Sequence, residues 1–497
     1  MYSDSDAAAH KGTRSDPSRD LVVASNFIRA VRESGYVSLS TALAELIDNS
    51  IQADATVIAI AISRPGADAA PEIQVLDDGA GMNRSQLESC LQFGGTARFG
   101  DRRSFGRFGI GLPAASLSQS CRIEVRAWQR GGTPFAVHLD VDEIASGAPA
   151  QFRSVPTSFE PSTPSGCAVV WRQCDRIEYQ RLAWLERALH RDLGRMYRRF
   201  LGRGVKLTIN GSRVKPLDPL LLEAPVEGHT AALAFEPMRY ELSTADCGTS
   251  FVTVRFSVLP VDAWHHLDNL AKRRAGIVGA GGVSILRAGR EIAYGWHLMG
   301  GKRKENYDDW WRCEIEFEPA LDEHFGITIN KQGIRPSAQL REAIEPELES
   351  IARMLNGRVR QAFEDVKFRQ ATQHSCRIAE AADPQLPVLA KGRKRSRNGT
   401  LAYRLSSCPV PSEAMFSTSL TQHTLQVVLN VDHPAFAALY RPLQALADES
   451  GGSDLRTAIE LLLLSFARAE AALGPGARPG DLIAAWSTAY ARMLQKS

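Results

Sequence analysis

The chain has 497 residues, too many for one ordinary hydrophobic core, so two or three domains are expected. Its 59 lysine and arginine residues against 56 aspartate and glutamate residues leave a formal charge of only +3, which neither requires nor excludes a nucleic-acid partner. The eight cysteines form no C-x-x-C pair, the N-terminus has no apolar signal core, and apolar runs such as Leu461–Leu464 are far shorter than the roughly 20 residues of a membrane span. We therefore predict a cytoplasmic protein with reduced thiols and no membrane partner.

The first part of the chain predicts a flexible segment followed by an α/β domain. Residues 1–20 are polar with few bulky apolar side chains, and residues 21–202 alternate between helical and strand-like patterns. The expected elements are a helix over Ser38–Gln52, strands over Thr56–Ile62 and Glu72–Leu76, a helix over Asn83–Gln92, later strands over Cys121–Trp128, Phe135–Val141 and Cys167–Gln173, and a helix over Arg176–Gly202. This order predicts a sandwich in which helices pack on one face of a mixed sheet.

A second α/β domain is expected over residues 203–368. It begins with a hairpin at Asn210-Gly211, continues through further strand-like runs, and closes with a helix over Ser337–Lys367. A linker with the basic run Lys391–Arg397 is expected over 369–400, and an interaction domain, mixed α/β or mainly helical, over 401–497. The predicted fold class is therefore α+β.

Three short motifs can carry chemistry, and the first lies on the helix Ser38–Gln52. Glu45 and Asn49 are four residues apart and so project from the same face, one turn apart. Glu45 can polarise a water molecule, and Asn49 can give an oxygen to Mg²⁺. Taken alone, the pair also fits a solvated helix surface.

The second motif is Asp77-Asp78-Gly79-Ala80-Gly81-Met82, at the end of an apolar strand. A buried Asp77 can accept a hydrogen bond from an exocyclic amine, and the glycines leave room for a base. An ordinary Asp-Gly turn is the alternative interpretation of this motif.

The third motif is a glycine-rich loop, Gly106-Arg107-Phe108-Gly109-Ile110-Gly111-Leu112, that leads into a helix. Backbone N–H groups at a helix N-terminus suit a triphosphate. Upstream, Phe93-Gly94-Gly95-Thr96 and Arg98–Ser104 can fold over such a site as a lid.

In order and spacing these motifs resemble those of the GHKL ATPases, the superfamily of gyrase, the dimeric heat-shock chaperones, histidine kinases and MutL. Residues 44–50 are similar to the N-box, Asp77–Gly81 to the adenine-binding box, and Gly106–Gly111 to the lid hinge. The P-loop signature is absent. The resemblance implies a Bergerat-type pocket for ATP and Mg²⁺, with Glu45 as general base and Asp48 in support. It implies nucleotide contacts from Asn49, which also holds the metal, and from Asp77, Gly79, Gly81, Met82, Gly95, Thr96, Gly106, Arg107, Phe108, Gly109, Ile110, Gly111 and Leu112.

The resemblance extends into the second domain. Ile327–Gln332 is similar to the segment of MORC-like and MutL-like proteins from which a lysine reaches the γ-phosphate, which makes Lys331 a catalytic candidate. With Gly106-Arg107-Phe108-Gly109 and the hairpin at Asn210-Gly211, this segment favours the prokaryotic MORC/MutL-like branch. Two residues depart from the pattern: Pro113 stands where a lysine is usual, and Cys167 stands where a threonine often helps at the adenine site.

The resemblance implies an ATP-gated homodimeric clamp that hydrolyses ATP. Its expected setting is DNA, or an assembly with other proteins of a restriction, phage-defence or DNA-processing system. A chaperone-like ATPase that remodels proteins is the alternative. A sensor histidine kinase fits less well, because His10 is the only histidine ahead of Glu45. A protein that binds ATP without hydrolysing it is disfavoured because Glu45 is present.

Overall fold

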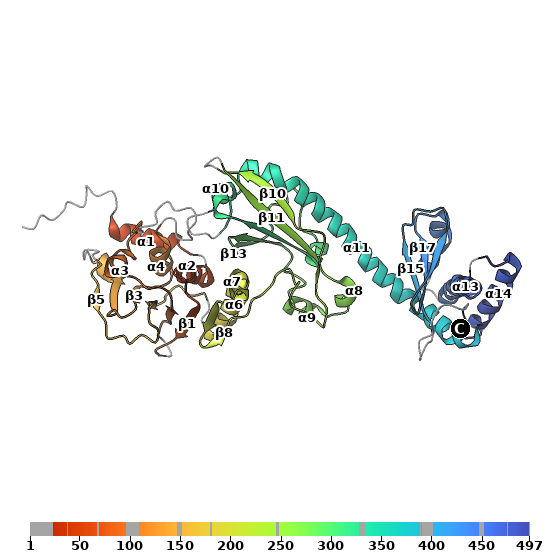
Figure 1. Cartoon of the computed structure of the whole chain (residues 1–497), viewed down its shortest axis with the longest axis horizontal. Coiled ribbons are helices and arrows are strands. Elements are labelled where there is room, and N and C mark those ends of the chain that lie inside the picture. The colour runs from red at the N-terminus through yellow and green to blue at the C-terminus, as the bar shows by residue number, and fades with distance from the viewer. Residues whose placement is uncertain are drawn as a thin grey trace, which may run out of the picture. The chain divides into compact units, whose positions relative to one another are not determined.

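The computed structural model describes residues 23–36, 38–66, 69–95, 109–146, 152–178, 181–244, 248–327, 333–387, 389, 401–446, 452–474 and 476–496. These residues form the predicted α+β fold, with three separate sheets (Figure 1). The chain divides into two compact units. One holds the residues up to Leu259 together with Asn269–Ala352, and the other holds Pro260–Asp268 and the residues from Arg353 onward.

The first sheet has eight strands, which lie in the order β5-β4-β3-β6-β2-β1-β7-β8. Every neighbouring pair is antiparallel except β1 and β7. The strands are β1 (Val57–Ser63), β2 (Glu72–Asp77), β3 (Arg122–Trp128), β4 (Phe135–Asp140), β5 (Val155–Pro156), β6 (Gly166–Arg172), β7 (Lys206–Ile209) and β8 (Ser212–Arg213). Every second residue of β2 is buried, so Ile73, Val75 and Asp77 face the same side of the sheet.

Helices α1 (Ala24–Ser34), α2 (Leu39–Gln52) and α4 (Gly111–Gln119) pack together beside this sheet, above β3 and β1 in Figure 1. Helix α2 begins where the sequence predicts, because the Ser38 hydroxyl accepts a hydrogen bond from the backbone N–H of Thr41 in a capping box. The other helices of this part are α3 (Arg84–Ser89), α5 (Val141–Ala145), α6 (Leu182–Met196) and α7 (Arg198–Gly202). The helix expected over Arg176–Gly202 is thus two helices, which meet at Tyr197.

The predicted hairpin at Asn210-Gly211 is present, but it belongs to the first sheet and not to the second. Strand β7 pairs in parallel with β1, and Leu207 and Ile209 are each 1% exposed in the core of the first sheet. The apolar side chains of β7 thus complete that core, so the first sheet does not end at the expected boundary of residue 202.

The second sheet also belongs to the first unit. Its strands lie in the order β10-β11-β14-β12-β13, with β9 beside β11. They are β9 (Ala232–Leu233), β10 (Met238–Ser243), β11 (Thr249–Val258), β12 (Val283–Arg287), β13 (Arg290–Gly295) and β14 (Trp311–Phe317). Short helices accompany them: α9 (Asn269–Arg274), η1 (Asn306–Trp310), η2 (Pro319–Leu321) and α10 (Asp322–Phe325).

Buried charges join α7 to the second sheet. Arg198 of α7 forms ion pairs with Glu291 of β13 at 3.0 Å and with Glu314 of β14. All three residues are at most 7% exposed. Because a buried charge is tolerated only with partners of opposite charge or with hydrogen bonds, this cluster fixes how α7 meets the sheet.

The second unit holds a three-stranded sheet in the order β15-β17-β16, packed with helices. Its elements are α8 (Val261–Trp264), the later part of α11 (Ala338–Ala382), η3 (Asp383–Gln385), β15 (Ala402–Cys408), β16 (Phe416–Thr421), β17 (Thr424–Asn430), η4 (Phe436–Tyr440), α12 (Arg441–Leu446), α13 (Gly452–Leu473) and α14 (Pro479–Leu494). Helix α11 continues to Ala382, so it replaces the first part of the linker expected over 369–400. The basic run Lys391–Arg397 lies outside the described residues.

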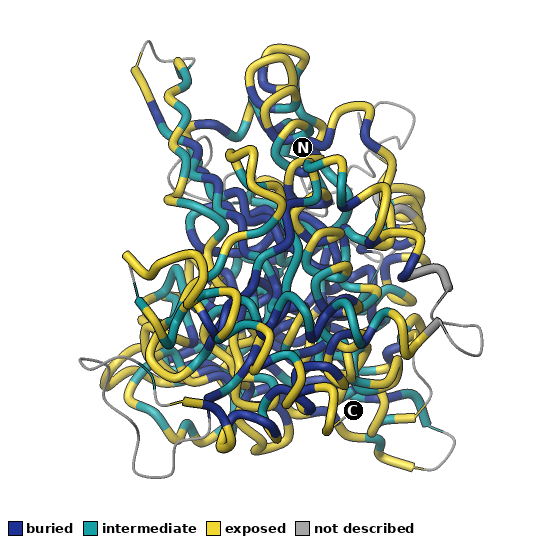
Figure 2. The backbone as a smooth tube through the Cα atoms, turned by 90° about the vertical axis from the view of Figure 1, so that its right-hand side faces the viewer, coloured by how far each residue is buried: buried dark blue, intermediate teal, exposed yellow. Residues whose placement is uncertain are grey.

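Separate apolar clusters fill the first sheet domain and the second unit. In Figure 2 the buried stretches, in dark blue, run through the interior, and exposed stretches, in yellow, lie at the outer turns. None of the helices in the described ranges is long and apolar enough to cross a membrane.

Candidate functional site

One face of α2 combines a buried carboxylate with an exposed carboxamide. Glu45 is 3% exposed, although it is charged and lies on a helix that packs against α4. One turn later, Asn49 is exposed. Burying a carboxylate is costly, so a buried acid beside an accessible amide is typical of a site that meets a ligand.

The carboxylate of Glu45 lies against the first residue of α4. A Cβ atom added to Gly111 would come within 2.5 Å of Glu45 Oε2. Only a residue without a side chain leaves room for this approach. The glycine therefore brings the acid of α2 to the N-terminus of α4, where the helix dipole and free N–H groups favour an anion.

Among the described residues, none is seen to cap the N-terminus of α4 with its side chain. Ile110 precedes the helix without giving it a side-chain hydrogen bond, and Pro113 in the first turn has no N–H of its own. Nearby, the backbone N–H of Gly94 donates to the Gly109 carbonyl oxygen at 3.0 Å. This bond joins the two glycine-rich segments that the sequence predicts as parts of a lid and hinge.

Asp77, at the end of β2, is buried and held by three donors. Its Oδ2 accepts from the Ser50 hydroxyl of α2 at 2.8 Å, and its Oδ1 accepts from the N–H groups of Gly79 at 3.0 Å and Cys167 at 3.2 Å. Burial raises the pKa of the Asp77 carboxyl, although these three hydrogen bonds act to lower it. The Ser50 bond ties the second motif to the helix that carries the first.

Glycines shape the space around Asp77. A Cβ on Gly79 would lie 2.8 Å from the Ala53 carbonyl oxygen, and a Cβ on Gly81 would lie 2.0 Å from the Trp128 carbonyl oxygen. Gly81 also has a φ of +69°, in the region that favours glycine. Asp78 has a different function, because its carboxylate caps β1 through Thr56 and Val57. Asp78 is therefore a structural residue, whereas Asp77 borders the site.

Asp48 is the second acid of α2, and it faces the second sheet. The Tyr197 hydroxyl lies 2.8 Å from Asp48 Oδ1, and Arg290 Nε of β13 lies 3.1 Å from the same oxygen. Burial alone would lower the pKa of the Arg290 guanidinium, but the nearby charges of Asp48 and Glu45 raise it. Burial and the charge of Glu45 also raise the pKa of the Tyr36 hydroxyl. Arg290, Asp48, Tyr197 and Tyr36 therefore lie near the catalytic candidate Glu45.

The structure brings several of the predicted site residues together. Glu45 meets Gly111, and Asp77 is bonded to Gly79 and to α2. Met82 and Leu112 are half-buried and pack on the first core. Gly95 is half-buried, and a Cβ there would lie 2.4 Å from the Ser89 carbonyl oxygen. The residues outside the described ranges are Thr96, Gly106, Arg107, Phe108 and Lys331.

Ser50, Tyr197 and Arg290 were not among the predicted site residues. Ser50 directly follows Asn49 at the end of the N-box-like motif, so its place in that motif is a signal for it. Tyr197 and Arg290 are far from the motifs in sequence, and neither lies in a pattern that marks it. Cys167 contributes its backbone N–H, and burial raises the pKa of its thiol well above the usual value.

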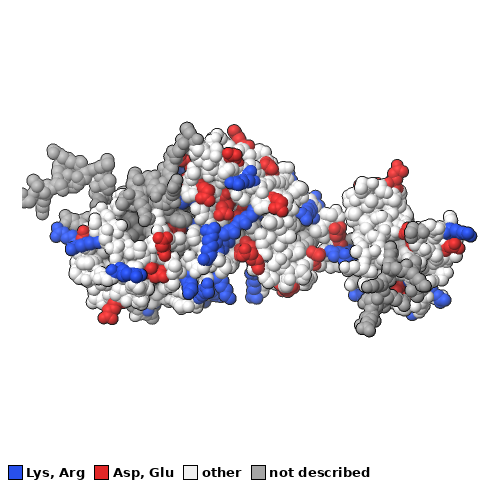
Figure 3. Space-filling view, in the orientation of Figure 1, with Lys and Arg blue, Asp and Glu red and all other residues white. Residues whose placement is uncertain are grey.

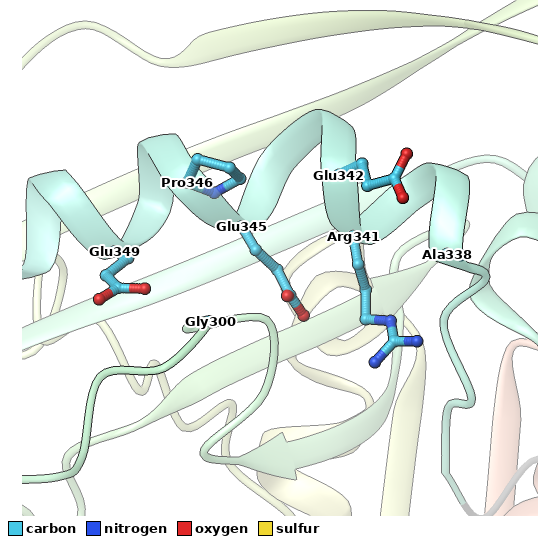
Figure 4. A pocket seen from close by; sticks show the side chains of 7 residues that line it. All are labelled: Gly300, Ala338, Arg341, Glu342, Glu345, Pro346 and Glu349. Carbon is cyan, nitrogen blue, oxygen red and sulfur yellow. The ribbon is translucent and has the colours of Figure 1, made fainter.

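A surface hollow of about 400 Å³ lies elsewhere, between the start of α11 and the Gly300 loop (Figure 4). It is lined by Gly300, Ala338, Arg341, Glu342, Glu345, Pro346 and Glu349. Three of the 7 lining residues are glutamates and none is a predicted site residue, so we do not assign the hollow to the same chemistry.

The arrangement beside α2 suits a nucleotide. A buried acid at the N-terminus of an uncapped helix can activate water beside a phosphate, and a buried Asp among glycines can accept a hydrogen bond from the amine of a base. Within the described ranges, no three His, Cys, Asp or Glu side chains gather as a metal site. A hard cation held by nucleotide phosphates and by the oxygen of Asn49 would need no such group.

Comparison with curated proteins found no match for the chain. Residues 37–163 match a family model described as histidine kinase-, DNA gyrase B- and HSP90-like ATPase. The matched range includes Glu45, Asp77 and Gly111, and it covers α2 through β5. The chain therefore carries a GHKL-type ATP-binding and ATP-hydrolysing domain within its first sheet domain.

Proposed function

We propose that this protein is an ATP-gated dimeric clamp of the MORC/MutL-like branch, which hydrolyses ATP in the pocket beside α2. The observation that carries the proposal is the approach of Glu45 to Gly111, because it sets a general base beside a phosphate-binding helix terminus. The bond from Ser50 to Asp77 supports it, since it ties the proposed adenine-reading acid at the end of β2 to the helix that carries Glu45.

In the proposed reaction, Glu45 accepts a proton from a water molecule as the water oxygen attacks the γ-phosphorus. The bond to the bridging oxygen breaks, and ADP and phosphate leave. Asn49 would hold Mg²⁺, which when bound neutralises charge on the phosphate oxygens. Asp77 reads the adenine amine, the glycine-rich segments close over the nucleotide, and Lys331 contacts the γ-phosphate.

The proposed partner of the clamp is duplex DNA, within a restriction, phage-defence or DNA-processing assembly. Figure 3 shows lysine and arginine side chains, in blue, gathered over the region of α7 and β8. The exposed basic residues of this region are Arg203, Lys206, Arg213 and Lys215. Such a surface attracts phosphates without reading sequence, so binding through it falls steeply with salt.

The test is steady-state ATP hydrolysis by the full chain, with and without duplex DNA at two salt concentrations. We expect wild type to turn over, and Glu45→Ala and Lys331→Ala to bind ATP without hydrolysing it. Stimulation by DNA that weakens with salt supports the clamp. Hydrolysis by Glu45→Ala at the wild-type rate would overturn the proposal. Normal hydrolysis that DNA leaves unchanged would instead favour protein remodelling.

A further inference from the structure

The hairpin of β12 and β13 carries two buried arginines on either side of its turn. Arg287 and Arg290 face each other across the strands, and each has a side chain that is 3% exposed. Arg287 Nε binds Asp322 Oδ1 of α10 at 2.7 Å, within its own part of the fold. Arg290 instead leaves its own sheet and reaches Asp48 of α2. The two arginines therefore hold different parts of the first unit.

The turn between these arginines packs against α7. A Cβ on Gly289 would lie 3.6 Å from Arg199 Cβ, and β13 contacts both α6 and α7. Tyr197, between those helices, places its hydroxyl 2.7 Å from the carbonyl oxygen of Ala44 as well as beside Asp48. Ala44 directly precedes Glu45. Arg290 and Tyr197 thus both contact the turn of α2 that carries the proposed base.

Stabilisation of its own sheet does not explain why Arg290 is buried. Within the part of the chain that the structure describes, its Nη1 has no hydrogen-bond partner, although the side chain is almost fully buried. A buried guanidinium with an unused donor is costly to keep. The ion pair of Arg290 is with Asp48 of α2, the helix of the ATPase site. The contact that offsets the cost of burying Arg290 is therefore a contact with that helix.

We propose that Arg290 is a positioning residue for ATP hydrolysis, through which the second sheet holds α2 so that Glu45 stays aligned with the attacking water. On this proposal, ATP hydrolysis by the matched residues 37–163 depends on the second sheet, whereas ATP binding depends on it much less. This inference rests on the proposed ATPase reaction. A displacement of about 1 Å at a reacting group can cost up to roughly 100-fold in rate, so a lost grip on α2 lowers kcat.

The experiment compares Arg290→Met with Arg287→Met in the full chain. Each variant removes one buried guanidinium from the same hairpin, so a merely structural contribution lowers the melting temperature and the rate to similar extents in both. We measure kcat, the Kd of a fluorescent ATP analogue, and the melting temperature. For Arg290→Met we expect kcat to fall roughly 10- to 100-fold and Kd to change less than about threefold.

For Arg287→Met we expect kcat within about threefold of wild type, even where the melting temperature falls. Arg290→Lys, which keeps the charge but shortens its reach, should recover part of the rate, and it serves as the test variant where Arg290→Met does not fold. Asp48→Asn should lower kcat less in the Arg290→Met background than in the wild-type background, because both substitutions remove the same contact.

Equal loss of kcat in Arg290→Met and Arg287→Met would overturn the inference, as would a loss of ATP affinity as large as the loss of kcat. The proposed function is tested separately in the same assay by Glu45→Ala. An active wild type, an inactive Glu45→Ala and an Arg290→Met that behaves like Arg287→Met would contradict the inference alone. Hydrolysis by Glu45→Ala would remove the proposed function and the inference with it.

Discussion

Two buried glutamates, one in each unit, lie in opposite surroundings. Glu460 of α13 is 0% exposed, and its carboxylate accepts hydrogen bonds from Tyr440 at 2.6 Å, from Arg456 at 2.9 Å and from Ser375. Glu45 of α2 is 3% exposed, and its carboxylate borders a glycine at an uncapped helix terminus. Both acids are buried, yet only Glu45 adjoins backbone that is shaped for a ligand.

The difference shows how buried acids can be sorted by what surrounds them. Donors from three side chains surround Glu460. Its hydrogen bonds therefore hold α11, η4 and α13 together. Glu45 is kept close to a position where a side chain would collide with it. The comparison therefore predicts stability effects at Glu460 and activity effects around Glu45.

The largest stability effect is expected for Glu460→Gln. The change leaves the half-buried Arg456 without its charged partner, and breaking one partner of a buried ion pair costs at most about 3–5 kcal/mol. We expect the second unit to unfold earlier in a denaturant titration, with ATP hydrolysis by the still-folded protein unchanged. Loss of hydrolysis under conditions where the chain remains folded would break the distinction between the two acids.

Gly111→Ala, in contrast to Glu460→Gln, should mainly lower ATP hydrolysis. The new Cβ would lie 2.5 Å from Glu45 Oε2, so the carboxylate or the start of α4 must move. We expect a loss of roughly 10- to 100-fold in ATP hydrolysis and a stability cost of about 1–3 kcal/mol.

The matched control for Gly111→Ala is Gly357→Ala, in the interior of α11. Nothing lies within 4 Å of a Cβ added there, so alanine should stabilise the helix by about 0.5–1 kcal/mol and leave hydrolysis unchanged. If Gly111→Ala hydrolyses ATP as fast as Gly357→Ala, the close approach of Glu45 has no catalytic importance.

The smallest stability effect is expected for Asp77→Asn, and it depends on pH. Burial raises the pKa of Asp77 above its ordinary 3.8, so the folded protein binds that proton more tightly than the unfolded chain does. Wild type therefore loses stability as the pH rises from 3.8 through the raised pKa, whereas the asparagine variant does not.

The measurement for Asp77→Asn is the melting temperature of both proteins across this pH range. The difference, variant minus wild type, should grow with pH and then level off. The variant should also bind ATP about tenfold more weakly, because it loses a charged acceptor for the adenine amine. A melting difference that shrinks as the pH rises would contradict the assigned direction of the pKa shift.

The sequence predicted the elements that carry strong local signals. Helix α2 was placed by Ser38 and by its apolar spacing, and Asp77 was placed at the end of an apolar strand. These features depend on neighbours in sequence, so pattern and capping residues are enough to find them.

The features that the sequence missed depend on distant contacts. The Asn210-Gly211 turn predicts a hairpin but not the sheet that it joins. Strand β16 reads Phe-Ser-Thr-Ser-Leu-Thr, which has little apolar signal, and it forms by pairing with β17. Arg290 follows a turn and looks like a solvated charge until the fold buries it against Asp48.

The most direct test of the central claim is to measure ATP binding and ATP hydrolysis on the same preparations of wild type and Glu45→Gln. Glutamine keeps the size of the side chain but cannot accept the proton. We predict that the variant binds ATP with a Kd within about threefold of wild type and hydrolyses it roughly 10² to 10⁴ times more slowly. Hydrolysis by Glu45→Gln at the wild-type rate would contradict the assignment of α2 as the catalytic helix.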